Sequence, residues 1–357
     1  MSEHGGNSVE VAQQLSIAPE SLLDFSANIN PLGLSERVKS LITSHLDVIE
    51  RYPDIEYRHL HQALAMANQC DVEQVIAGNG ATELIYGLVR ALSPRRAMLL
   101  VPGFAEYRRA LVQHGCEVIE YRLNEEQGFQ PDRQLLEAVR QRRPDCLFIA
   151  TPNNPTGLMP EPQLLIELAE LCETLQIALI VDEAFIDFLP HGSSLALRLT
   201  HSRYLYLLRS LTKFFAIPGL RLGYLLSGNR ARIRQLKNNR EPWSVNALSS
   251  LVGQYLLNDD DYINVSHKYI ARQRDYLWQA LSQFASLLVW KPTANYLFFK
   301  CIKKDIDLKA ALLAHRILIR HCENYPGLDS RYYRVAVRTE DENRTLIQAL
   351  TQILTRD

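Results

Sequence analysis

The sequence predicts an α/β fold built on a mostly parallel sheet, and three observations carry this prediction. Between about Val75 and Ser210, short apolar runs alternate with amphipathic helical patterns. The run IALIV at 177–181 is apolar throughout, as expected of a parallel strand that helices cover on both faces. The length of 357 residues suits one large domain plus a smaller one.

The elements of the large domain, which we place at residues 41–240, follow in order along the chain. A strand runs into the sequence GNGATE at 78–83, and an apolar-periodic helix follows it to about residue 92. We then expect strands at 95–103, 116–123, 145–152, 177–185 and 203–210, with helices at 104–115 and 161–175.

The alternation of strand and helix patterns ends after about Arg240. A long helical stretch with Trp243 and Tyr255 leads to strand-like segments, and a helix closes the chain. The strand-like segments are 294–302 and 331–339, and the closing helix is 343–354. We expect a smaller α+β domain at 241–357. Residues 1–40 carry little periodic apolar sequence, so we expect them to form an N-terminal arm that packs with the small domain.

Composition excludes several classes of protein. A hydrophobic content of 47% and a charged content of 22% are those of a globular protein, and the formal net charge of −1 gives no bulk field for nucleic acid or an anionic membrane. The sequence shows no signal peptide and no membrane-spanning run. Six cysteines without a CxxC pair predict a reduced, cytoplasmic protein with no metal site.

Lys213 is the residue that most needs an explanation. It lies in LRSLTKFFAIPGLRLGYLL at 208–226, which otherwise reads as buried strand and tight turn. A lone buried ammonium is costly unless it pairs, lowers its pKa or reacts. Lys213 therefore either reaches solvent or has a covalent function. Ser210 and Thr212 beside it, with Arg221 after the next turn, could complete an anion site.

Three further groups follow predicted strands, and each has two interpretations. The free N–H groups of Gly80, Ala81 and Thr82 form an anion site, or a simply capped helix. Asp182 could pair with a protonated ring nitrogen at the mouth of the sheet, or form an N-cap or a surface ion pair. In TPNNPTG at 151–157, Asn153 or Asn154 is a fixed amide donor, or part of an ordinary turn.

Taken together, these groups indicate a pyridoxal phosphate pocket. The set contains a phosphate site, a carboxylate for a ring nitrogen, an amide donor and a lysine that can condense with an aldehyde. Each signal is weak evidence alone. Their order along the chain and their combined chemistry are stronger evidence. We therefore expect pyridoxal 5'-phosphate as the cofactor.

On these motifs the sequence resembles the fold type I pyridoxal-phosphate enzymes of the class I and II aminotransferase family, over nearly the whole chain. The resemblance implies that Lys213 binds the cofactor covalently and that Asp182 pairs with its ring nitrogen. It implies that Asn154 bonds the ring hydroxyl. It also implies a set of residues around the cofactor phosphate, namely Gly80, Ala81, Thr82, Ser210, Thr212 and Arg221.

The resemblance extends to four further positions. It implies that Phe104 in PGFAEY stacks on the cofactor ring and that Arg334 in RYYRVAV binds the substrate α-carboxylate. Tyr52 in RYPD matches a tyrosine that reaches the cofactor phosphate of the neighbouring subunit, which implies a homodimer. Phe185 replaces the tyrosine that aminotransferases carry in DEAY.

Within the family, the segments HGGN, DFSANINPLG and ENYPGLDSRYYRVAVR are similar to the threonine-phosphate decarboxylases of cobalamin biosynthesis. These release CO2 from L-threonine O-3-phosphate and leave (R)-1-amino-2-propanol phosphate. The resemblance implies a substrate phosphate site at Arg320, Asn28 and His4. The alternative is a histidinol-phosphate-type aminotransferase, which RYPD and NNPTG also resemble. Phe185 favours decarboxylation.

Overall fold

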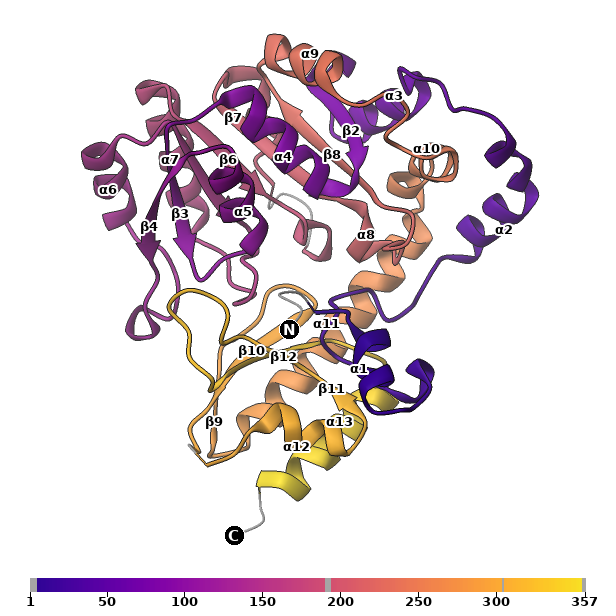
Figure 1. Cartoon of the computed structure of the whole chain (residues 1–357), viewed down its shortest axis with the longest axis vertical. Helices are drawn as coiled ribbons and strands as arrows, with labels where there is room; N and C mark the ends of the chain where they lie inside the picture. The colour runs from indigo at the N-terminus through magenta and orange to yellow at the C-terminus, as the bar shows by residue number, and fades with distance from the viewer. Residues whose placement is uncertain (1–4, 190–193, 304, 355–357) are drawn as a thin grey trace.

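A seven-stranded sheet forms the centre of the larger part of the molecule (Figure 1). The computed structural model describes residues 5–189, 194–303 and 305–354. The strand order is β2-β8-β7-β6-β5-β3-β4, and only β8 runs antiparallel to its neighbours. The strands are β2 Val75–Asn79, β3 Arg96–Val101, β4 Glu117–Arg122, β5 Cys146–Ala150, β6 Ala178–Asp182, β7 Leu205–Ser210 and β8 Leu222–Ser227.

Helices cover both faces of this sheet because successive strand residues point to opposite sides. In β6, Ile180 belongs to one buried cluster, whereas Leu179 and Val181 belong to the other. The first cluster contains residues of α4 Gly80–Leu92, α5 Ala105–Gln113 and α9 Arg230–Asn239. The second contains residues of α3 Arg58–Ala67, α6 Gln134–Arg142 and α7 Pro162–Leu175. The predicted α/β class with a mostly parallel sheet is confirmed.

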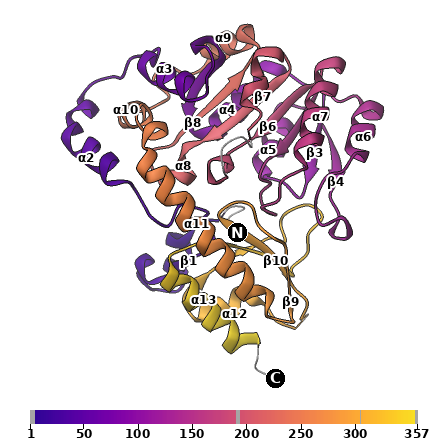
Figure 2. The ribbon, with the colours of Figure 1, turned by 180° about the vertical axis from the view of Figure 1, so that it is seen from behind.

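A four-stranded antiparallel sheet of order β12-β13-β10-β9 forms the smaller part. Its strands are β9 Leu287–Val289, β10 Tyr296–Cys301, β12 Arg320–His321 and β13 Tyr332–Ala336. The helices beside it are α11 Asp260–Ser282, α12 Leu308–Ala314 and α13 Glu340–Leu354, which Figure 2 shows from behind. Their apolar residues share a third buried cluster with the sheet.

The first half of the described N-terminal arm contacts the smaller part. The strand β1 Leu23–Asp24 pairs in parallel with β11 Ile317–Leu318. The helix α1 Ser8–Gln14 packs Val11 and Ala12 against Leu318. The helix α2 Glu36–Ser44 follows. Short 3-10 helices lie at Pro19–Ser21, Leu46–Glu50, Val72–Gln74, Glu125–Gln127, Ile186–Phe188, Ala196–His201 and Leu256–Asn258.

The segment after Arg240 differs from the sequence prediction. The expected long helical stretch with Trp243 and Tyr255 is wrong, because Trp243 has a positive φ of 54° and lies outside any helix. The helix α10 Ala247–Gly253 starts only where the Asn246 side chain accepts a bond from the Ser249 N–H at 2.8 Å. The helix α10 follows the predicted domain boundary at 240/241, yet it packs on α3 beside the large sheet. The position of this boundary stays a prediction.

In the part of the chain that the structure describes, no helix has the length and apolarity needed to cross a membrane.

Candidate active site

Several strand ends meet at one edge of the large sheet. Asp182 is the last residue of β6 and Ser210 the last of β7, and these strands are parallel neighbours. The strand β8 begins at Leu222 and pairs with β2 on one side and β7 on the other, so Asn79 and Ser210 flank its first residues. The start of α4, the end of β7 and Arg221 therefore lie around one point.

The Asp182 carboxylate is buried, with 7% of the residue exposed. Its Oδ1 accepts a hydrogen bond from the Ala184 N–H at 2.9 Å, and its Oδ2 accepts one from the Tyr107 hydroxyl at 2.5 Å. Burial raises the pKa of Asp182, whereas these two hydrogen bonds and the charge of Lys213 act to lower it. The carboxylate is thus held in place, and a positive partner would favour its charged form.

Lys213 lies in the single turn α8 Leu211–Phe214, and its side chain is partly buried. Burial, followed by the charges of Arg221 and Arg334, lowers the pKa of Lys213 to about 8. At neutral pH a useful fraction of this amine is unprotonated and can attack an aldehyde.

A residue of the N-terminal arm fixes this turn. The Asn30 N–H donates to the Lys213 carbonyl oxygen at 3.0 Å, and Asn30 Nδ2 donates to the Phe214 carbonyl oxygen at 2.9 Å. Asn30 is itself buried. The sequence prediction missed Asn30. A buried asparagine needs hydrogen-bond partners, but the segment DFSANINPLG does not show that Asn30 is buried or which groups it contacts.

The predicted phosphate residues form a cradle of hydrogen-bond donors. Gly80 has a φ of +78°, and a Cβ at this position would stand 2.7 Å from Arg221 Nη2. Only glycine therefore lets this guanidinium approach the start of α4, which also contains Ala81 and Thr82. Facing them, the hydroxyls of Ser210 and Thr212 lie 2.8 Å apart and are buried. Helix N–H groups, hydroxyls and a guanidinium fit a phosphate.

Arg334 connects three segments of the chain. Its Nη1 donates to Oδ1 of Asn154, and its Nη2 donates to the Ser26 carbonyl oxygen at 2.8 Å. Tyr325 also donates its hydroxyl to Oδ1 of Asn154, at 3.3 Å. The Arg334 guanidinium lies 5.5 Å from the centre of the Tyr296 ring. The large sheet, the small sheet and the N-terminal arm thus meet at one buried cation.

Arg320 lies directly opposite Arg334 in the antiparallel pair of β12 and β13. Both arginines are buried, with 8% and 5% of the residue exposed. Arg320 donates to Oδ1 of Asn324 at 2.7 Å and lies 5.3 Å from the centre of the Tyr325 ring. Like charges directly opposite in a sheet repel each other, so a bound anion would stabilise this pair.

The remaining predicted site residues are Asn28, Phe104, Tyr52 and His4, and the structure does not place all of them beside the cluster of Asp182, Lys213, Arg320 and Arg334. Asn28 is buried, and its Oδ1 has no hydrogen-bond partner among the described residues. Phe104 immediately precedes α5, with its ring edge-on to Tyr107 at 5.5 Å. Tyr52 is 80% exposed, and the centre of its ring lies 4.6 Å from that of Trp243. Within a single chain, Tyr52 therefore does not contribute to the cluster. His4 lies outside the described residues.

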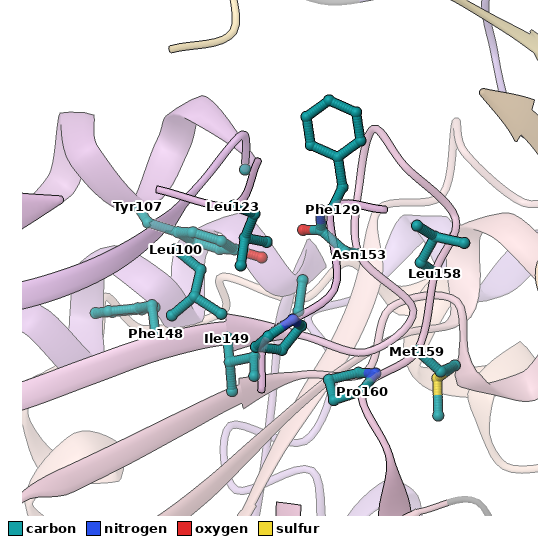
Figure 3. Close-up of a pocket in the computed structure, with 13 residues that line it drawn as sticks. Leu100, Tyr107, Leu123, Phe129, Phe148, Ile149, Asn153, Leu158, Met159 and Pro160 are labelled. Atoms are coloured by element: carbon teal, nitrogen blue, oxygen red, sulfur yellow. The ribbon is translucent and has the colours of Figure 1, made fainter. Parts of the chain in front are cut away.

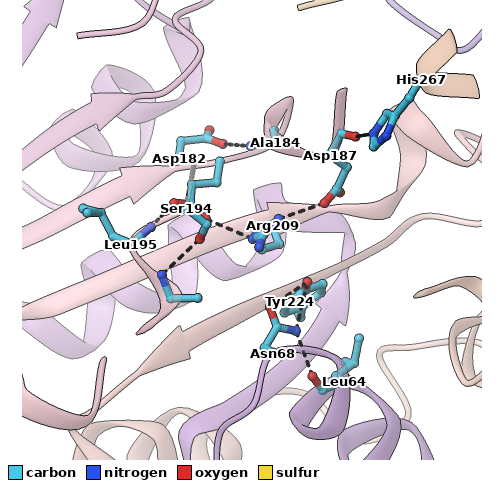
Figure 4. A network of polar contacts seen from close by, with 12 residues as sticks. Leu64, Asn68, Asp182, Ala184, Asp187, Ser194, Leu195, Arg209, Tyr224 and His267 are labelled. Atoms are coloured by element: carbon cyan, nitrogen blue, oxygen red, sulfur yellow. Dashed lines mark hydrogen bonds and ion pairs between the residues drawn. The ribbon is translucent and has the colours of Figure 1, made fainter. Parts of the chain in front are cut away.

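A buried ion network lies beside the cluster (Figure 4). Arg209 Nε is 3.0 Å from Glu183 Oε2, and Arg209 Nη1 is 2.8 Å from Asp187 Oδ1. The Glu183 carboxylate also accepts bonds from the Ser194 hydroxyl and the Leu195 N–H at 2.8 and 3.1 Å. Because Glu183 follows Asp182 and Arg209 precedes Ser210, this network fixes the ends of β6 and β7 relative to each other.

Phe185 contacts Tyr296, with their ring centres 4.9 Å apart, and is itself buried. The Tyr296 hydroxyl donates to the Asn153 carbonyl oxygen at 2.7 Å. Tyr107, Tyr296 and Tyr325 are tyrosines of this region that the sequence analysis did not assign to the site, and Tyr107 is the one that contacts Asp182. Its position three residues after Phe104, one helical turn along α5, was the available signal.

Comparison with known proteins adds to this geometry. The family model described as aminotransferase class I and II matches residues 20–350. The chain is 50% identical, over 354 residues, to a threonine-phosphate decarboxylase of Salmonella typhimurium, covering 99% of this chain and 97% of that protein. It is 33% identical to the adenosylcobalamin biosynthesis bifunctional protein CobDQ of Leptospira interrogans, covering 98% of this chain but 41% of that protein.

Among solved structures, the histidinol-phosphate aminotransferase of Clostridium acetobutylicum matches with a TM-score of 0.87 at 30% identity. The match covers 93% of this chain and 99% of that chain. The fold is therefore shared by proteins with different activities, and the residues of the site must distinguish between these activities.

Proposed function

Because this chain belongs to the class I and II aminotransferase family, we propose that it is a pyridoxal 5'-phosphate enzyme that decarboxylates L-threonine O-3-phosphate. The products are CO2 and (R)-1-amino-2-propanol phosphate, in cobalamin biosynthesis. The observation that carries this proposal is the 50% identity, over 354 residues, to a threonine-phosphate decarboxylase. The facing arginines of the small sheet support it, since this substrate carries both a carboxylate and a phosphate.

The residues around Lys213 would hold the cofactor. The Lys213 amine would bind its aldehyde carbon, and Asp182 would keep a proton on its ring nitrogen. Asn154 would donate to the ring hydroxyl and Phe104 would cover the ring face. The cradle of Gly80, Ala81, Thr82, Ser210, Thr212 and Arg221 would hold its phosphate. When bound, the cofactor supplies a conjugated ring that accepts the electron pair left on the substrate Cα.

Arg334 and Arg320 would bind the two ends of the substrate. Arg334 would take the carboxylate, and Arg320 with Asn28 would take the phosphate, together with His4. Two anchors would fix the torsion about the bond between the substrate amino nitrogen and Cα, and this torsion selects whether the bond from Cα to the carboxylate or the bond from Cα to hydrogen breaks. With the carboxylate held by Arg334, CO2 would leave, and Lys213 Nζ would deliver a proton to Cα.

The alternative activity is that of a histidinol-phosphate-type aminotransferase. Its support is the shared fold and the motifs RYPD and NNPTG. One relative with that name, from Methanosphaera stadtmanae, is 26% identical over 98% of this chain. An aminotransferase must break the Cα–H bond and return the amino group to a keto acid. Phe185, which cannot donate a hydrogen bond to the cofactor, favours the decarboxylase.

The deciding experiment supplies the purified enzyme and cofactor with carboxyl-labelled L-threonine O-3-phosphate. We expect labelled CO2 and stoichiometric amino-propanol phosphate with no keto acid added. L-histidinol phosphate with 2-oxoglutarate is the comparison reaction. Glutamate formed from the comparison pair, without CO2 from the first substrate, would establish the aminotransferase instead.

We also propose a homodimer in which Tyr52 reaches the partner subunit's cofactor phosphate. The exposure of Tyr52 supports this proposal, because an 80% exposed tyrosine in contact with a tryptophan is typical of an interface residue. Exposed apolar side chains lie nearby in sequence at Leu46, Ile49 and Ile55. Burial of such a set between two copies would remove apolar area from water.

A cytoplasmic location is likewise a proposal. The six cysteines are free thiols, five of them buried, and burial raises the pKa of the partly buried Cys70 thiol to about 11. Protonated, unpaired thiols are typical of proteins from reducing compartments.

A further inference from the structure

We propose that Tyr107 is a positioning residue for the cofactor, whose phenol holds the Asp182 carboxylate oriented and charged toward the cofactor ring nitrogen. The inference rests on the proposed function, because it takes Asp182 as the partner of that nitrogen. Tyr107 would act through Asp182 and would not itself touch the substrate.

The hydrogen bonds of Asp182 are the first support. Each carboxylate oxygen has one donor, the Ala184 N–H for Oδ1 and the Tyr107 hydroxyl for Oδ2, at 2.9 and 2.5 Å. The Ala184 bond comes from the same short segment and moves with it. The Tyr107 bond comes from α5, on a different element, so it fixes the carboxylate relative to the body of the protein.

The packing of the Tyr107 ring is the second support. The ring stacks on Phe148 of β5 at 5.1 Å and 24°, and Phe104 lies edge-on to it. Figure 3 shows Tyr107 and Phe148 beside a pocket whose other lining is mostly apolar. The cavity measures about 10 Å³, about the smallest space that holds one water molecule. The ring therefore has little freedom, and the direction of its hydroxyl is set by packing.

The electrostatics of the pair agree with this geometry. Burial and the charge of Asp182 raise the pKa of Tyr107 well above its ordinary value, so the phenol stays protonated and donates. Burial alone would raise the pKa of Asp182 and favour its neutral form. Of the influences that oppose burial, the hydrogen bond from Tyr107 is the largest, ahead of the Ala184 bond and the charge of Lys213.

Tyr107 also has contacts with two predicted cofactor residues at once. Its hydroxyl binds Asp182, expected at the ring nitrogen, and its ring supports Phe104, expected on the ring face. A change from tyrosine to phenylalanine removes the first contact and keeps the second. This separation makes the role of the hydroxyl testable by itself.

The test measures cofactor binding by the apoenzyme in equilibrium dialysis, with Tyr107→Phe compared with wild type. We expect binding of pyridoxal phosphate about tenfold weaker, as for the loss of one hydrogen bond to a charged group. With ring-labelled [15N]pyridoxal phosphate, we expect the nitrogen resonance to move toward that of neutral pyridine. A purely structural role would not move this resonance.

Tyr86→Phe is the matched control. Tyr86 of α4 also donates its hydroxyl to a carboxylate, that of Glu106 of α5, at 2.7 Å. The control variant is expected to bind the cofactor as wild type does. An unchanged dissociation constant and resonance in Tyr107→Phe would overturn the inference.

A second comparison adds Tyr107→Phe to the Asp182→Asn variant. In this variant residue 182 carries no charge that the Tyr107 hydroxyl could stabilise. If Tyr107 acts through the charge of Asp182, adding Tyr107→Phe to this background lowers cofactor affinity no further. A further loss of cofactor affinity in the double variant would refute the inference. Wild-type apoenzyme that binds no pyridoxal phosphate would instead refute the proposed function.

Discussion

Arg334 Nη2 lies 2.8 Å from the backbone carbonyl oxygen of Ser26, and this hydrogen bond joins the small antiparallel sheet to the N-terminal arm. The other end of the same guanidinium donates to Asn154, which follows a strand of the large sheet. The predicted carboxylate site is therefore assembled from three segments that are remote in the sequence.

Arg334→Lys should lower kcat/KM for L-threonine O-3-phosphate by roughly 10- to 100-fold, because one ammonium cannot hold two partners and a carboxylate as a planar guanidinium does. Cofactor absorbance should stay that of wild type. Steady-state CO2 release measures the effect. Arg338→Lys is the control, since Arg338 bonds Glu342 at 2.7 Å. Equal losses in both variants would contradict the assignment.

The rate of cofactor incorporation into the apoenzyme should rise with pH and level off above about pH 8. The pKa of Lys213 is lowered to about 8, so its reactive neutral form is already abundant there. Below that pH the neutral fraction falls about tenfold per unit, and the rate should fall with it. Stopped-flow absorbance with limiting pyridoxal phosphate gives the profile. A midpoint near 10.5, the ordinary value, would refute the prediction.

Lys213→Ala should abolish the covalent chromophore that borohydride reduction traps in wild type. CO2 release should fall by at least about 10²-fold, since the amine also serves as the proton donor. Mass spectrometry of the reduced protein locates the adduct. A reducible adduct that persists in the variant would place the cofactor on another lysine.

Mixing Tyr52→Phe subunits with Lys213→Ala subunits should restore activity that neither variant has alone. In a mixed dimer, one site receives Lys213 from one subunit and Tyr52 from the other, so a complete site forms. Activity after refolding the mixture measures this complementation. No gain over the separate variants would argue that Tyr52 acts within its own chain or not at all.

Arg209→Met should destabilise the protein by about 3–5 kcal/mol, because it leaves the buried Glu183 and Asp187 without their cation. Arg198→Met, which removes an exposed ion pair with Glu170, should cost about 0–1 kcal/mol. Urea unfolding followed by tryptophan fluorescence compares the two. Similar midpoints would mean that the network contributes little.

Much of the fold could be predicted from local patterns. The run around Leu179 and Val181 was recognisable as a strand because a fully buried strand is apolar on both faces. The antiparallel direction of β8 could not be predicted, because a strand's direction depends on the strands with which it pairs in the folded protein. The turn at Trp243 was missed although Pro242 before it and Asn246 after it are signals of an interrupted helix.

The site was predictable where chemistry follows a strand end, as for Asp182 and Lys213. The spacing from Phe104 could place Tyr107 near the site, but its bond to Asp182 could not be predicted, because this bond joins residues 75 positions apart and depends on how α5 packs on the sheet. Tyr52 shows a different limit, since a residue that would serve the neighbouring subunit has no visible role within one chain.

The contact between Asn30 and the turn of Lys213 has a consequence for biosynthesis. The Asn30 side chain bonds a carbonyl 184 positions later in the chain. On the ribosome, Asn30 must therefore wait until that turn has emerged, and the closing of so long a loop is slow relative to local helix formation. The turn of Lys213 thus acquires this contact only after residue 214 has been synthesised, while Arg320 and Arg334 are still to be added.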